Sequence, residues 1–97
     1  MAAVAFLPEA RAEFLAVVEQ YAAVSLELGE DFVAEVESAL ARISAFPGHG
    51  SPYHGGTRRV VLRRFPYDVV YRSVDAGTHV VALAHHRRTP FYWKQRV

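Results

Sequence analysis

The spacing of the hydrophobic residues changes once along the chain, after residue 48. Before that point they recur every three or four residues, as at Phe14, Val17 and Tyr21, a spacing typical of an amphipathic helix. After it, strand-length segments are rich in valine, tyrosine and other β-branched or aromatic residues. A chain of 97 residues has material for one hydrophobic core. The sequence therefore predicts a single domain, residues 1–97, in which helices precede most of a sheet.

Two helices are expected in the first half. The first covers about residues 9–27, because Pro8 suits the first helical turn and Gly29 is expected to stop the helix. The second begins near Glu30 and ends at Pro47. Since the connection is short, the helices should form an antiparallel hairpin.

Strands are expected in the second half, with one short strand added at the start of the chain. Pro66 and the turn residues 75–77 separate the later segments. The expected strands are 4–7, 58–65, 67–74 and 78–86. The order β-α-α-β-β-β predicts an α+β fold, with the N-terminal helical hairpin packed on one face of a small, mainly antiparallel sheet. The other face of the sheet would be free.

Charge divides the chain at the same place as hydrophobic spacing. Residues 1–48 carry eight acidic and two basic side chains, a net charge of −6. Residues 49–97 carry nine basic and two acidic side chains, a net charge of +7, and all five histidines. The second half can therefore attract phosphate or an acidic protein surface.

The composition excludes several kinds of functional site. Without cysteine the chain has no disulfide, no thiolate zinc ligand and no thiol nucleophile, which fits a cytoplasmic protein. The longest apolar run, residues 2–7, is too short to span a bilayer, so no membrane partner is expected. No cofactor is expected, and no metal site either, because no carboxylate stands near the clustered histidines His49, His54, His85 and His86.

Guanidinium groups beside an imidazole could act on RNA, with arginines holding the scissile phosphate and His85 as a base near neutral pH. Equally, the arginines could form a solvated face and His85 could be a packing residue at a strand end. Trp93 and its aromatic neighbours could form an aromatic contact by stacking on unpaired bases, or they could pack into the hydrophobic core. The candidate phosphate-binding or target-binding residues are Arg58, Arg63, Arg64, Arg72 and Arg88.

The sequence resembles the toxins of the RelE/ParE superfamily over nearly its whole length. The first half has suitable helical-hairpin residues, including Tyr21, Leu28-Gly29 and Phe32. The second half carries the more specific order Gly56, Arg58, Arg59, Leu62, Arg64, Phe65-Pro66-Tyr67, Val70-Tyr71-Arg72, His85, Arg88, Pro90, Tyr92, Trp93 and Arg96. The resemblance implies the toxin of a type II toxin-antitoxin, or plasmid stabilisation, system, which is a cytoplasmic bacterial protein silenced by a cognate antitoxin.

Two functions follow from this resemblance. ParE-like members poison DNA gyrase without an active site of their own, and we favour this function because the chain has a single lysine, Lys94. RelE-like members are ribosome-dependent, metal-free mRNA endoribonucleases, and in that alternative His85 would be the base and Tyr92 the acid. Whether the protein is an enzyme depends on which branch it follows.

Overall fold

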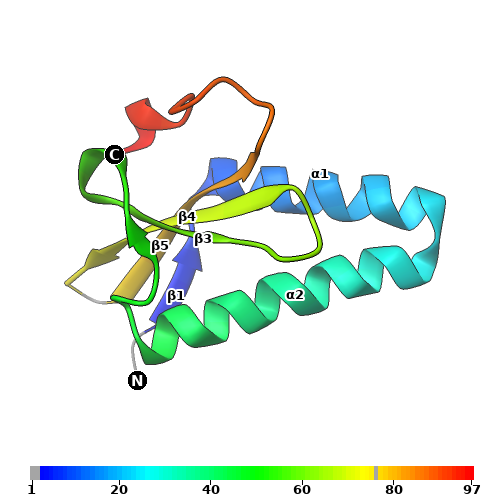
Figure 1. Cartoon of the computed structure of the whole chain (residues 1–97), viewed down its shortest axis with the longest axis horizontal. Helices are drawn as coiled ribbons and strands as arrows, with labels where there is room; N and C mark the ends of the chain where they lie inside the picture. Colours follow the sequence, from blue (N-terminus) through cyan, green and yellow to red (C-terminus); the bar gives the residue numbers. More distant parts are fainter. Residues whose placement is uncertain (1–2, 76) are drawn as a thin grey trace.

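The computed structural model describes residues 3–75 and 77–97 and has two helices beside a five-stranded sheet (Figure 1). The sheet order is β1-β5-β4-β3-β2; β1 runs parallel to β5, and the other neighbours are antiparallel. The α+β fold with a mainly antiparallel sheet is therefore confirmed. The elements are β1 (Ala3–Phe6), α1 (Pro8–Val24), α2 (Leu26–Ala45), β2 (Ser51–Pro52), β3 (Arg58–Val61), β4 (Tyr67–Val74), β5 (Gly77–His85) and single 3₁₀ turns at His54–Gly56 and Lys94–Arg96.

The boundary between the helices differs from the prediction. Helix α1 ends at Val24, and the extended residue Ser25 caps α2 by accepting a hydrogen bond from the Leu28 N–H at 3.1 Å. Gly29 lies inside α2 and is not a stop. A Cβ at Gly29 would lie 3.0 Å from the Cβ of Ala22, so glycine there permits a close helix crossing.

The strand predicted over residues 58–65 ends at Val61. Beyond it, the Glu35 carboxylate of α2 accepts hydrogen bonds from the Arg63 and Arg64 N–H groups at 2.5 and 3.4 Å. Arg63 and Arg64 lie in the bend that follows β3. The sequence did not indicate the two-residue strand β2, and Ala76, expected in the turn before β5, lies outside the described residues.

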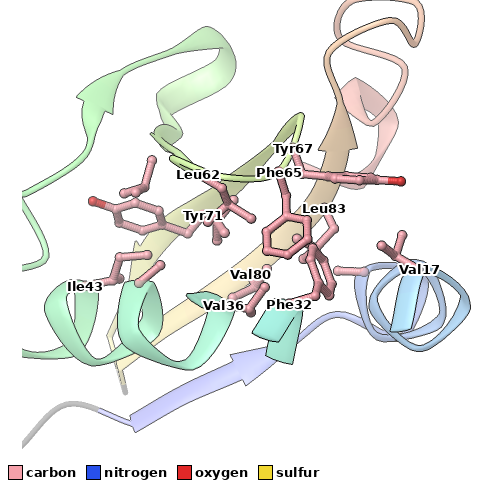
Figure 2. Close-up of a cluster of buried hydrophobic side chains, with 14 residues drawn as sticks. Val17, Phe32, Val36, Ile43, Leu62, Phe65, Tyr67, Tyr71, Val80 and Leu83 are labelled. Carbon is pink, nitrogen blue, oxygen red and sulfur yellow. The ribbon is translucent and has the colours of Figure 1, made fainter. Parts of the chain in front are cut away.

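The main core lies between the helical hairpin and one face of the sheet (Figure 2). Phe32 is its centre, with ring contacts to Phe14, Tyr21, Phe65 and Tyr67 at centroid distances of 5.1 to 6.0 Å. Such stacked, tilted and edge-on pairs add to the stabilisation from burial. The fully buried residues of α2 recur at Phe32, Val36, Ala39 and Ile43, which is the helical spacing read from the sequence.

The second face of the sheet is not free, in contrast to the expectation. The segment after β5 returns across the molecule toward the loop before β3 (Figure 1). Trp93 packs there with Val70, Val81 and Ala82 in a second cluster of buried residues. Phe91 stacks on His54 at 4.7 Å. The aromatic residues near the C-terminus therefore cover apolar strand positions that would otherwise meet water.

Neither helix in residues 3–75 and 77–97 combines the length and the apolar composition that a membrane span requires.

Candidate functional site

Glu13 of α1 holds the C-terminal segment of the chain. Its carboxylate accepts hydrogen bonds from the Tyr92 hydroxyl at 2.6 Å and from the Arg96 guanidinium at 3.0 and 3.1 Å. The main-chain N–H of Leu83 adds a bond of 3.2 Å, and Arg88 lies at 3.4 Å. The Glu13 side chain is 14% exposed. One largely buried carboxylate thus gathers donors from β5 and from the segment beyond it.

This environment changes the acidity of Tyr92. Burial, and then the hydrogen bond to Glu13, raise the pKa of the Tyr92 phenol well above its ordinary value of 10. The hydroxyl therefore stays protonated and donates to Glu13. The Arg88 guanidinium lies over the face of the Tyr92 ring, 3.6 Å from the ring centroid.

His85 closes β5 and lines a pocket together with Ala16 and Val17 of α1. Its ring meets the Tyr67 ring edge-on at 4.9 Å, and its Nδ1 accepts a hydrogen bond from the Arg87 N–H at 3.0 Å. No hydrogen bond or ring contact joins His85 to Tyr92 in the described part of the chain. The candidate base and the candidate acid are therefore not paired.

A different histidine is paired with an acid. His86 Nε2 donates a hydrogen bond of 2.9 Å to Asp68 Oδ1, and Arg59 lies 3.4 Å from Asp68 Oδ2. The Asp68 side chain is 9% exposed. Sequence reasoning missed this cluster, although alternation along the strands could have found it. Asp68 is opposite Ala84, and His86 follows Ala84 by two residues, so the two side chains share one face of the sheet.

A cavity of about 380 Å³ opens beside this cluster. Its lining includes Asp68, His86, Arg59, Arg88 and Phe91, together with the predicted pair His85 and Tyr92. Arg59 also lies over the Tyr53 ring, 4.5 Å from its centroid. The cavity thus combines two guanidinium groups, two imidazoles and aromatic walls with a single carboxylate that is already paired.

The remaining predicted arginines do not gather at this cavity. Arg58 donates to the Gly50 carbonyl at 2.7 Å, and Arg64 forms an ion pair of 2.8 Å with Asp31 of α2. Arg63 is exposed in the bend after β3. Arg72 is half-buried on β4, and its Nε has no hydrogen-bond partner among the residues that the structure describes. The structure therefore brings Arg88 near the two histidines and holds the other four elsewhere.

Trp93, expected as an aromatic contact, is 1% exposed and completes the second cluster of buried residues. Its ring lies 5.7 Å from that of Tyr53. Packing against Val70, Val81 and Ala82 accounts for this position, because a large apolar ring gains most from leaving water. Trp93 is therefore a packing residue at the wall of the cavity.

A helical hairpin on a five-stranded, mainly antiparallel sheet, with an arginine- and histidine-rich segment after the last long strand, places the protein in the class of RelE/ParE superfamily toxins. The family model described as the ParE toxin of type II toxin-antitoxin system, parDE, matches residues 4–90. The chain belongs to this family.

A solved structure agrees with this assignment at the level of the fold. The chain is similar to one in the chromosomal ParDE toxin-antitoxin system from P. aeruginosa, with a TM-score of 0.75 and 19% sequence identity. The similarity covers 88% of this chain and 96% of the other. No curated protein matches the sequence.

Proposed function

We propose that this ParE-family toxin arrests growth by poisoning DNA gyrase and that a cognate antitoxin neutralises it. Membership of the family supports a role in a ParDE toxin-antitoxin pair. We favour gyrase as the target because of the contacts that His85 and Tyr92 make. Poisoning of gyrase requires a complementary surface and no catalytic groups.

The observation that carries the proposal is the hydrogen bond from Tyr92 to Glu13. A RelE-like nuclease built on His85 and Tyr92 needs both groups turned toward a scissile phosphate. Tyr92 instead donates to Glu13 with a raised pKa, which makes the phenol a poor general acid. His85 packs against Tyr67. These contacts favour recognition by surface over catalysis by this pair.

The charge distribution supports an acidic antitoxin segment. Residues 49–97 carry the net charge of +7, and several of their basic side chains are exposed and lie on neighbouring parts of the chain after β5, namely Arg87, Arg88 and Lys94. An acidic segment would be attracted to this surface, which we call the C-terminal basic surface.

The test compares the two targets on the same variants. The purified protein is incubated with gyrase, ATP and relaxed plasmid, and in parallel with programmed ribosomes and messenger RNA. We expect inhibited supercoiling or trapped cleavage complexes, and no codon-dependent cleavage of messenger RNA. The His85→Gln and Tyr92→Phe variants should inhibit gyrase nearly as well as the wild type does. Thermal unfolding of each variant provides the control for folding. Cleavage of messenger that His85→Gln abolishes would contradict the proposal.

A second candidate function, the metal-free endoribonuclease, is favoured by the His86 and Asp68 pair. A buried carboxylate that orients an imidazole is a common arrangement for a general base, and Arg59 and Arg88 line the same cavity. In that function His86→Gln would abolish cleavage at the ribosome, whereas His85→Gln would not. The endoribonuclease function would be excluded if the wild type did not cleave messenger RNA and if His86→Gln inhibited gyrase as well as the wild type does.

A further inference from the structure

An apolar groove of about 340 Å³ runs between α1 and α2. None of its lining residues belongs to the cavity described above. Val18 and Ala22 line it from α1, and Leu26 and Val33 line it from α2. It lies on a different flank of α2 from Phe32 and the other buried core residues. The groove is therefore open to a partner while the core stays covered.

Small residues at the helix crossing keep the groove unfilled. Gly29 lies against Ala22, and neither has a side chain long enough to occupy the space beside the contact. At the tip of the hairpin, Val24 and Leu26 are 76% and 72% exposed. An exposed apolar tip beside an apolar groove is a surface that gains from being covered.

Acidic side chains line the groove and make it negatively charged. Glu30 and Glu37 are both exposed lining residues, and the lining includes no basic residue. The first half of the chain has only Arg11 and Arg42 as basic residues, and Arg42 donates to Ser38 at 3.3 Å. A partner in the groove therefore meets a negative field, opposite to that of the C-terminal basic surface.

We propose that this groove binds a basic amphipathic helix of a partner protein. The groove walls are helices whose backbone groups are bonded within each helix, so they offer no edge for an added strand. A third helix can lay apolar side chains between α1 and α2. Glu30 and Glu37 are two turns apart, about 10.5 Å along the axis. The partner helix needs apolar residues at i, i+3 or i+4, and i+7, with lysine or arginine beside them.

A second copy of this chain does not fit the groove. Two grooves facing each other would bring Glu30 and Glu37 against the same residues of the other copy, and like charges repel. The exposed basic residues of the described chain lie mainly on strands, loops and the three-residue turn Lys94–Arg96, which is too short to act as an amphipathic helix. Charge complementarity therefore assigns the groove to another protein, distinct from the acidic segment proposed for the C-terminal basic surface.

The experiment uses the full-length, isotope-labelled protein and a synthetic peptide of about 14 residues, which is nearly four helical turns. Its leucines follow the i, i+4, i+7 spacing and its other positions are lysine, arginine or alanine. We expect amide NMR shifts of Ala22, Leu26 and Val33, and binding that weakens as salt rises. The double variant Glu30→Gln/Glu37→Gln should bind about fivefold to tenfold more weakly. The matched control, Glu9→Gln/Asp75→Asn, removes the same charge outside the groove and should bind as the wild type does.

One further variant and two altered peptides test the same groove. Ala34→Arg places a positive charge at an exposed lining position, and its binding should be lost while its thermal unfolding stays close to that of the wild type. A scrambled peptide of the same composition and an analogue with glutamate in place of the basic residues should both fail to bind. Equal binding by either peptide, shifts confined to residues outside the groove, or full binding by the Glu30→Gln/Glu37→Gln variant would overturn the proposal.

Discussion

Tyr92 and Glu13 lie 79 positions apart in the sequence, and a hydrogen bond of 2.6 Å joins them. Glu13 also accepts from Arg96, so one carboxylate of α1 fixes both a phenol and a guanidinium of the C-terminal segment. The same segment carries Trp93 into the second cluster of buried residues. The first helix and the last residues are therefore parts of one packing unit.

Glu13→Gln is expected to destabilise the fold. The Arg96 side chain is 15% exposed, and loss of the carboxylate leaves its charge without a charged partner in a largely buried place. The free energy of unfolding should fall by about 2 to 4 kcal/mol, measured by urea denaturation. Glu19→Gln, at an exposed position of the same helix, is the control and should change it by less than about 0.5 kcal/mol. Equal effects of the two substitutions would show that the Glu13 contacts contribute nothing specific.

Stability should depend on pH in the alkaline range through Tyr92. Because its pKa is raised in the folded protein above the ordinary value of 10, the unfolded chain loses this proton first as pH rises. The stabilisation is complete below pH 10 and is lost as pH increases beyond it. Unfolding free energies measured across this range should fall less steeply in Tyr92→Phe than in the wild type. Parallel slopes in the two proteins would contradict the assignment.

Gly29→Leu should weaken the helix crossing. A side chain there meets Ala22 at once, since a Cβ alone would lie 3.0 Å from the Ala22 Cβ. Overpacking of this kind costs about 1 to 3 kcal/mol, and the midpoint of thermal unfolding should fall by several degrees. Gly48→Ala is the control, because apart from its chain neighbours no atom of the described residues lies within 4 Å of the added Cβ. A midpoint unchanged by Gly29→Leu would mean that the helices can separate there without cost.

Binding of the antitoxin should depend on salt and on the C-terminal basic surface. We expect the dissociation constant to rise as salt is increased, because exposed charges are screened over shorter distances. Removing Arg87 and Lys94 together, both exposed, should raise the dissociation constant at low salt and reduce the salt dependence. Isothermal titration with the purified antitoxin gives both quantities. Salt-independent binding would place the main contacts outside this surface.

The sequence predicted the elements better than the contacts between them. Hydrophobic spacing located both helices and the long strands, because it reflects the faces that each element buries. Gly29 was misread as a helix stop, because a glycine chosen for close packing looks in sequence like one chosen to end a helix. Glu13 could not be found at all, since its partners come from residues 83 to 96 and no local pattern marks them.

The parallel pairing of β1 with β5 has a consequence for the nascent chain. Val4 pairs with Thr78 and Phe6 with Val80, so β1 leaves the ribosome before β5, its neighbour in the sheet, has been made. Contacts over such sequence distances are costly to close and form late. The helical hairpin can form early, but its apolar faces stay uncovered until the sheet assembles. The sheet therefore cannot be completed until β5 has been translated, and a fragment that ends before β5 lacks the strand that joins β1 to β4.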